Sequence, residues 1–344
     1  MKKAILKSIR NLEVVECPIY SIGTKEILIK VKACGICGAD IKSYKHGHRD
    51  LTLPRVLGHE ITGVIFAKGS QVSDNYAIGN RVQISPGVFC NSCDYCISNR
   101  DNLCNQMEII GFDRDGGMQE YLLMDEKSIA SSIINPLPSE LSFELGTYAE
   151  PLACTMNMQD KMNLAVVDTL LIIGAGRLGT LHYLLAKEKK IPNVIVADIN
   201  SQRLDNELFE NTINVIDKNL NSEINAITKN QGACATIICC SVPEVLSLAI
   251  TNTKKSGVIG YFSGFTEGSI SLKELNLIHY KEITMVGSYG CKESDNLKAL
   301  QLLNEKQNLF EKIDRVLLPI DEIDKGMNLL TNYKTLSVII KMED

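Results

Sequence analysis

The sequence lacks the features that mark membrane proteins, exported proteins and nucleic-acid-binding proteins. Its longest apolar runs, such as residues 170–173 and 236–240, are far shorter than the roughly 20 residues that span a bilayer. The N-terminal segment has neither the apolar core nor the cleavage site of a signal peptide. The 41 acidic residues outnumber the 36 basic ones, so no basic surface for phosphate backbones is indicated. We therefore expect a cytoplasmic protein that binds neither membranes nor nucleic acid.

Internal repeats and low-complexity segments are also absent. Hydrophobic residues make up 45% of the chain and charged residues 22%, which is close to the average of soluble globular proteins. At 344 residues the chain is long for one core, because domains usually contain about 100 to 200 residues. Two domains are therefore expected.

Two patterns of secondary structure divide the chain. Residues 1–130 contain short β-rich segments, such as 27–37, 60–69 and 80–85, interrupted by Gly, Pro and Asp. From about residue 169, apolar strands alternate with helical stretches, which predicts parallel βαβ units. The last segment has an amphipathic stretch and a final strand, which we assign to the first domain. The predicted fold class is α/β, with a β-rich domain beside a doubly wound parallel sheet.

Twelve cysteines in a large chain without an export signal favour metal binding over disulfides. Four of them form the pattern Cys90-x2-Cys93-x2-Cys96-x7-Cys104. Four thiolates at this spacing can close a tetrahedral shell around one Zn²⁺, and a closed shell leaves no position for substrate, so this zinc would be structural. The alternative, a loop of unliganded surface cysteines, is poor chemistry for a reducing cytosol.

A glycine-rich turn follows the apolar strand at 169–173 and opens a helical stretch. It consists of Gly174, Ala175, Gly176, Arg177, Leu178 and Gly179. The next apolar strand ends on Asp198, 19 residues beyond Gly179. This order is typical of dinucleotide sites, in which the glycines allow close approach, the helix N-terminus receives the pyrophosphate and the acid binds a ribose hydroxyl.

The acid at Asp198 would repel a 2′-phosphate, so we expect NAD rather than NADP as the cofactor. Arg203 complicates this expectation if it reaches a phosphate, although it also fits a solvated helix residue. The remaining alternative is a glycine turn in some other kind of βαβ protein.

Cys37, His59 and Glu150 form a third, scattered set of possible zinc ligands, each next to Gly or Pro. Three protein ligands and an open fourth position make a catalytic zinc site. Taken singly, a histidine or glutamate is more often structural or solvated. Cys34 and Cys37 also form a CxxC pair, but the sequence around them lacks a thioredoxin-like pattern.

These motifs give the chain a family resemblance. CGICGAD, GHEITG with Gly69 beyond it, the four-cysteine loop, EPLAC and GAGRLG occur in the order found in the zinc-containing medium-chain dehydrogenases. That group includes alcohol, sorbitol and threonine dehydrogenases. The resemblance spans nearly the whole chain, and the EPL sequence is most similar to sorbitol and related polyol dehydrogenases.

The resemblance implies a GroES-like catalytic domain at residues 1–148 and 291–344. A Rossmann NAD-binding domain at residues 149–290 would be inserted in it, with the active site in the cleft between the two and a homodimer or homotetramer as the assembly. Cys37, His59 and Glu150 would hold the catalytic zinc, with Glu60 as an alternative ligand.

Three further residues match family positions. Asp40 matches the residue that hydrogen-bonds the zinc-binding histidine and so fixes its tautomer and orientation. Gly287 and Ser288 match the segment that reads the nicotinamide amide.

The chain departs from the family pattern at Ala39. The family usually has Ser or Thr two residues after the zinc cysteine, where the hydroxyl passes the alcohol proton toward solvent. Proton transfer would then run through Glu60, Glu150, Tyr44 or His46, and the sequence does not select among them.

Together these features predict a zinc-dependent oxidoreductase that transfers a hydride between a secondary alcohol and NAD, with two zinc ions per chain. A polyol or sugar alcohol is the expected substrate. Simple secondary alcohols, threonine-like amino alcohols and phosphorylated polyols are alternatives, because substrate pockets vary independently of fold. A nucleotide-binding protein without turnover is the rival from another class, but such a protein needs no open zinc site.

Overall fold

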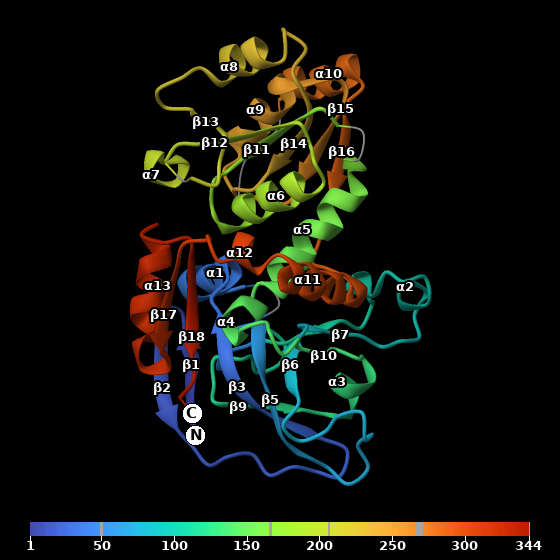
Figure 1. Ribbon diagram of the computed structural model, residues 1–344, viewed down its shortest axis with the longest axis vertical. Coiled ribbons are helices and arrows are strands. Elements are labelled where there is room, and N and C mark those ends of the chain that lie inside the picture. The colour runs from blue at the N-terminus through green and yellow to red at the C-terminus, as the bar shows by residue number, and fades with distance from the viewer. Residues whose placement is uncertain (49–50, 165–166, 206, 266–270, 344) are drawn as a thin grey trace. The chain divides into compact units, whose positions relative to one another are not determined.

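The computed structural model describes residues 1–48, 51–164, 167–205, 207–265 and 271–343 (Figure 1). The chain divides into two compact units: unit 1 is Met1–Ala153 with Cys291–Asp344, and unit 2 is Cys154–Gly290. The first division falls five residues beyond the 148/149 boundary suggested by the sequence, because helix α5 (Ala149–Lys161) runs through it. None of the described helices combines the length and the hydropathy that a membrane span requires.

Unit 1 is built on a seven-stranded, mainly antiparallel sheet. Along the sheet the strands follow the order β10 (Ile134–Pro136), β6 (Arg81–Ile84), β5 (Glu60–Lys68), β3 (Ile27–Gly35), β18 (Ser337–Lys341) and β17 (Arg315–Pro319), and β9 (Tyr121–Met124) also pairs with β3. β18 pairs antiparallel with β3, which joins the C-terminal segment to this unit.

Smaller elements complete unit 1. A second sheet contains β2 (Asn11–Glu16), β1 (Lys2–Ser8) and β4 (Arg55–Val56), and a ribbon contains β7 (Gly87–Val88) and β8 (Glu108–Ile109). The helices are α1 (Gly38–His46), α2 (Asp94–Ile97), η1 (Asp101–Leu103), α3 (Glu126–Ala130), α4 (Phe143–Gly146), α11 (Glu293–Glu305), α12 (Gln307–Phe310), η3 (Ile320–Glu322) and α13 (Ile323–Thr331).

The core of unit 1 lies against the central strand pair. Ile27, Ile29 and Val31 alternate along β3 and are fully buried, as strand periodicity requires when one set of side chains faces a core. Ile61 and Ile65 of β5 join the same cluster. This packed pair of strands provides a rigid base for the residues at its end.

Helix α1 lies where the sequence suggested only short β-rich pieces. Cys37 is its N-cap residue, and the backbone N–H of Cys37 donates to Oδ2 of Asp40 at 2.8 Å. The buried residues of α1 are the polar Asp40 and Ser43. A helix that buries polar side chains shows no apolar periodicity, which is why the sequence pattern missed it.

Unit 2 is a six-stranded parallel sheet with helices around it (Figure 1). The strand order is β13 (Asn211–Asn214), β12 (Asn193–Asp198), β11 (Thr169–Ile173), β14 (Ala233–Ile238), β15 (Thr253–Tyr261) and β16 (Thr284–Gly287). This order, 3-2-1-4-5-6 in sequence terms, is that of dinucleotide-binding sheets. The helices are α6 (Arg177–Glu188), α7 (Ser201–Leu204), α8 (Leu220–Ile227), α9 (Glu244–Asn252) and α10 (Leu272–Lys281), with most of α5.

Candidate functional site

The four cysteines of unit 1 converge on one point. Their sulfur atoms are separated by 3.5 Å (Cys93 to Cys96, and Cys104 to Cys90) and by 3.9 Å (Cys90 to Cys96, and Cys93 to Cys104). Zinc–sulfur bonds of about 2.3 Å at tetrahedral angles separate two sulfurs by about 3.8 Å. The spacing of the sulfurs therefore fits a closed tetrahedral zinc site.

The environments of these thiols shift their pKa values in opposite directions. Hydrogen bonds from Ser92 and from the backbone of Cys93 lower the pKa of Cys90 to about 5, whereas burial and Cys93 raise the pKa of Cys96 to about 12. Neighbouring thiolates repel one another, so all four ionise together only around a cation.

A second group of donors in unit 1 contains Cys37, His59 and Glu60. The sulfur, one imidazole nitrogen and one carboxylate oxygen all lie within 4.8 Å of one another. His59 and Glu60 are buried, and Cys37 is half-buried. Sulfur, nitrogen and oxygen of these three types are the ligands that zinc takes in proteins.

Strand register brings these three residues together. Gly35 at the end of β3 pairs with Glu60 at the start of β5, and Cys37 follows Gly35 by two residues. A Cβ at Gly35 would collide with the carboxylate of Glu60. The absence of a side chain at Gly35 therefore gives Glu60 its place beside Cys37.

Asp40 lies beside His59, where the family resemblance put it. Its Oδ1 is 3.6 Å from Nδ1 of His59, an ion-pair distance rather than a hydrogen bond, and it accepts a hydrogen bond from the N–H of Gly58 at 3.3 Å. Burial opposes the charged imidazole, but Asp40 and Cys37 raise the pKa of His59 well above its ordinary value. These two groups thus provide a negative environment around the imidazole.

Glu150 lies outside this close group of donors. It is buried in the first turn of α5, and its carboxylate oxygen lies within 4.8 Å of the sulfur of Cys291. Among the described residues, the carboxylate that joins Cys37 and His59 is that of Glu60. Zinc binding by Glu150 stays a prediction.

The candidate relay residues are spread over α1 and its end. Ala39 is half-buried and offers no hydroxyl, and Tyr44 packs against the hydrophobic core. His46 is exposed at the last position of α1. The proton route through Tyr44 or His46 stays a prediction.

Phe112 is a site residue that the sequence patterns missed. Its ring centroid lies 5.5 Å from that of His59 and 4.9 Å from that of His48, and the side chain is buried. Phe112 therefore forms a wall beside the imidazole. An aromatic residue within the glycine-rich segment 111–117 was the only signal in the sequence.

The glycine-rich turn of unit 2 has the geometry of a phosphate-binding turn. Gly174 follows β11 with φ of +116°, and Gly176 is the N-cap of α6. A Cβ at Gly179 would collide with the carbonyl oxygen of Gly174. Arg177 is buried and Leu178 is half-buried in the first turn of α6. The N-terminus of α6, which begins at this turn, can receive a pyrophosphate.

Asp198 is fixed at the end of β12 by two backbone groups. Its Oδ2 accepts from the N–H of Ala175 at 2.6 Å, and its Oδ1 accepts from the N–H of Asn200 at 2.8 Å. Arg203 lies near Gly176 of the glycine turn. A Cβ built on Gly176 would be 3.8 Å from Nη1 of Arg203. The acid and the glycine turn therefore form one local structure.

Gly287 and Ser288 lie at the carboxyl end of β16, the outermost strand of the same sheet on the side of β11 away from β12. Gly287 is the last residue of β16, and Ser288 follows it directly. Because the strands of this sheet are parallel, the ends of β11, β12 and β16 lie along one edge. Ligands of such sheets bind at this edge.

Comparison with known proteins identifies the family to which the chain is similar. Residues 23–134 match the alcohol dehydrogenase GroES-like domain, and residues 178–305 match the zinc-binding dehydrogenase family. The chain is 30% identical over 339 residues to an uncharacterized zinc-type alcohol dehydrogenase-like protein of Haemophilus influenzae, which covers 97% of this chain and 96% of that protein. It is 28% identical over 296 residues to a sorbitol dehydrogenase of Bacillus subtilis, which covers 84% of this chain and 82% of that protein.

Two solved structures also resemble the chain. A protein from Sinorhizobium meliloti, described as a zinc-binding dehydrogenase and bound to NADP, has 27% identity and a TM-score of 0.87 over 99% of this chain and 98% of that chain. A short chain alcohol dehydrogenase from Escherichia coli, complexed with NADH, has 26% identity and a TM-score of 0.86 over 99% of both chains. The chain therefore belongs to the zinc-type alcohol dehydrogenase family, oxidoreductases that act on CH–OH groups and combine a GroES-like domain with a zinc-binding dehydrogenase domain.

Proposed function

We propose that the protein interconverts a polyol or sugar alcohol and the corresponding ketone with NAD, using two zinc ions per chain. The observation that carries the proposal is the convergence of Cys37, His59 and Glu60 in unit 1. Three ligands of different types leave a fourth tetrahedral position for a substrate oxygen, unlike the closed set of four cysteines. The similarity to a sorbitol dehydrogenase supports a polyol as the substrate class.

Bound zinc would supply Lewis acidity toward the substrate hydroxyl, and bound NAD would supply the hydride acceptor. The protein's own contribution is position and charge. Asp40 orients His59 from one side, and Phe112 covers its ring. Such support holds the donors in the geometry that a metal site requires.

The proton of the alcohol needs a route that does not use residue 39. Glu60 is a buried carboxylate within 4.8 Å of the donor atoms of Cys37 and His59, so it is a group that could accept the proton. A polyol offers a further route, because a hydroxyl on the neighbouring carbon can stand in for the missing side chain. A polyol substrate is therefore consistent with alanine at this position.

The preference for NAD is proposed from Asp198. The two backbone hydrogen bonds hold its carboxylate at the edge where a ribose would lie, and a fixed negative charge there disfavours a 2′-phosphate. Arg203 is the opposing feature, since a guanidinium near the glycine turn would attract a phosphate. We propose that the carboxylate dominates because it accepts hydrogen bonds from the ribose hydroxyls of NAD.

We also propose a cytoplasmic homodimer or homotetramer. All twelve cysteines are free thiols, which fits a reducing compartment. The oligomeric state follows from the family resemblance.

A substrate panel tests the proposal. Reduced nicotinamide is followed by its absorbance with NAD or NADP and four alcohols: a polyol, a simple secondary alcohol, threonine and a phosphorylated polyol. We expect the highest kcat/KM for the polyol with NAD. A higher value for any other alcohol would reassign the substrate class, and no turnover with all four would favour the nucleotide-binding protein without activity.

A further inference from the structure

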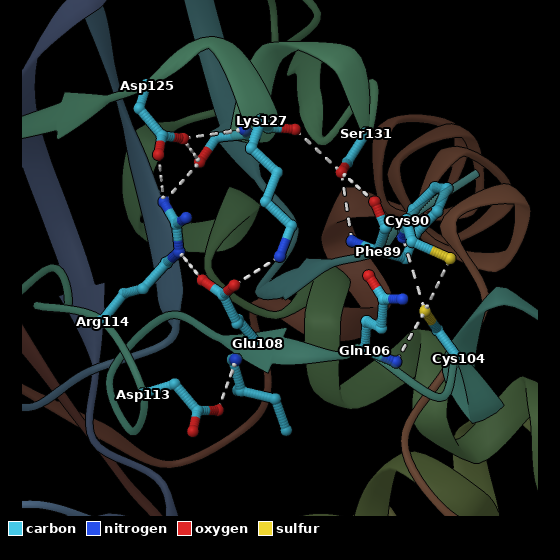
Figure 2. A network of polar contacts seen from close by, with 12 residues as sticks. Phe89, Cys90, Cys104, Gln106, Glu108, Asp113, Arg114, Asp125, Lys127 and Ser131 are labelled. Atoms are coloured by element: carbon cyan, nitrogen blue, oxygen red, sulfur yellow. Dashed lines mark hydrogen bonds and ion pairs between the residues drawn. The ribbon is translucent and has the colours of Figure 1, made fainter. Parts of the chain in front are cut away.

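The four-cysteine segment is connected to the rest of unit 1 through the very short ribbon of β7 and β8. β7 leads toward Cys90 and β8 follows Cys104, with Val88 opposite Glu108. Two residues in each strand provide few backbone hydrogen bonds, and short isolated ribbons are marginally stable. We call the chain from β7 into Cys90 and the chain from Cys104 into β8 the two legs of the segment. Their separation depends on other contacts, and Figure 2 shows that helix α3 and the residue after it provide them.

The leg that leads into Cys90 is held by Ser131. The hydroxyl of Ser131 donates to two carbonyl oxygens, that of Phe89 at 2.9 Å and that of Lys127 at 3.0 Å. Oγ of Ser131 also accepts from the N–H of Phe89 at 3.1 Å. Ser131 is fully buried. In addition, Nδ2 of Asn91 donates to the carbonyl oxygen of Ala130 at 2.9 Å. The residues on both sides of Cys90 are thus bound to the end of α3.

The leg that follows Cys104 is held by charge. The carboxylate of Glu108 accepts from Nε of Arg114 and from Nζ of Lys127, and Nη1 of Arg114 pairs with Asp125 at 2.8 Å (Figure 2). The hydrogen bond from Lys127 lowers the pKa of Glu108, and Arg114 lowers it further. Partial burial opposes both effects but does not cancel them. The four side chains are between 25% and 40% exposed, so solvent screens them less than it screens a free surface pair.

We propose that Glu108, Lys127 and Ser131 are positioning residues that hold the two legs of the four-cysteine segment at the separation a tetrahedral zinc site needs. We call these three residues the α3 clasp. They contact neither the metal position nor the sulfur atoms, yet they decide whether all four sulfurs can reach one ion at once. The inference rests on the structural zinc of the proposed function, and it does not depend on the substrate.

The consequence is slow release of the metal. A closed four-thiolate site loses its ion only when at least one leg moves away. Without the clasp this motion is easier, so the ion leaves faster even though every ligand is still present. Substitution of a residue that supports a ligand typically changes metal affinity by about 10- to 100-fold.

Release of cobalt from Co²⁺-loaded protein tests this proposal. Coordination by four thiolates gives Co²⁺ a charge-transfer absorption that distinguishes this site from one with mixed ligands. We would follow the decay of that absorption in excess EDTA for the wild type, Glu108→Gln and Ser131→Ala. Both variants should lose cobalt about tenfold faster than the wild type, at an unchanged midpoint of global unfolding.

Glu126→Gln is the matched control. Glu126 lies on the same helix and pairs with Lys25 at 2.7 Å, with 66% of its side chain exposed. Its loss should change the release rate by less than about twofold, because an exposed pair contributes little. Added salt should speed release from the wild type more than from Glu108→Gln, since the Debye length falls to about 3 Å at about 1 M.

Two results would overturn the proposal. One is release from Glu108→Gln and Ser131→Ala at the wild-type rate, and the other is equal acceleration by Glu126→Gln. If Glu108→Gln fails to fold, Lys127→Gln and Ser131→Ala carry the test under the same criteria. Failure of the proposed alcohol oxidation would leave these release rates unaffected, so the two failures are distinguishable.

Discussion

Gly35 and Glu60 face each other across β3 and β5, and the carboxylate of Glu60 fills the space that a side chain at Gly35 would need. The pairing places this carboxylate beside Cys37 and His59. The local geometry of the candidate zinc site therefore depends on a residue that carries no functional group.

Gly35→Ala should displace Glu60 and reduce turnover. The added methyl group collides with the carboxylate, and a misplacement of about 1 Å at a reacting centre can cost about 10²-fold in rate. Steady-state kinetics with the best alcohol of the panel measures the effect. Gly38→Ala is the control, because no atom beyond its chain neighbours and its own helix backbone lies within 4 Å of the added Cβ, and its kcat should stay near that of the wild type. Equal kcat for both variants would contradict the role given to Gly35.

The parts of the fold that depend on local sequence could be predicted. The strand at 169–173, the glycine turn and the strand ending at Asp198 were predicted from apolar runs and glycine spacing, and the structure has β11, α6 and β12 there. Local patterns suffice because a buried parallel strand is apolar along its whole length.

The parts that depend on long-range pairing could not be predicted. Which carboxylate joins Cys37 and His59 depends on the register of β3 against β5, and the sequence favoured Glu150 with Glu60 as the alternative. Helix α1 was missed because its buried residues are polar. Phe112 reaches His59 through tertiary folding, and no local pattern indicates that contact.

The buried His182 should make unit 2 sensitive to acid. His182 is fully buried and packs edge-on against Phe262 with 4.7 Å between ring centroids. Burial, with a smaller contribution from Lys189, lowers its pKa to about 3 from an unfolded value of about 6.5. The unfolded state therefore binds the extra proton. The contribution of His182 to the free energy of unfolding is therefore fully present above about pH 6.5. It decreases by up to about 1.4 kcal/mol per pH unit as the pH falls toward about 3.

His182→Leu should flatten this dependence. Urea unfolding at about pH 7.5, 6 and 5 should show a smaller loss of stability for the variant than for the wild type. The exposed His46 provides the control, and His46→Gln should follow the wild-type curve. The same slope for His182→Leu and the wild type would show that His182 does not set the acid sensitivity.

Asp198→Asn should narrow the preference for NAD over NADP. The amide can still accept from the N–H of Ala175 at the same position, but it carries no charge to repel a 2′-phosphate. We expect the ratio of kcat/KM for the two cofactors to fall about tenfold, as for the loss of one charged hydrogen bond. Asp198→Ala should weaken NAD binding further because it also frees the glycine turn.

The exposed Asp217 provides the matched acid, and Asp217→Ala should leave the ratio unchanged. Better use of NADP than NAD by the wild type would show that Arg203, rather than Asp198, decides the cofactor.

Ala39→Ser should restore a relay hydroxyl. A well-placed general acid or base contributes about 10² to 10⁴ in rate, so turnover of a simple secondary alcohol should rise, most clearly near neutral pH. A polyol should gain little if its own neighbouring hydroxyl already serves. Ala39→Thr and Ala39→Val form a matched pair, because they differ by the hydroxyl at nearly equal volume. A rate below that of the wild type for Ala39→Ser on both substrates would contradict the relay hypothesis.

The zinc content of purified protein, measured together with turnover, tests the central claim most directly. The wild type should contain about two zinc ions per chain. Cys37→Ser should contain about one, keep the wild-type unfolding transition and lose alcohol oxidation, whereas Cys93→Ser should lower the yield of folded protein. Two zinc ions and full turnover in Cys37→Ser, or equal damage to folding by both substitutions, would contradict the division into a catalytic and a structural zinc site.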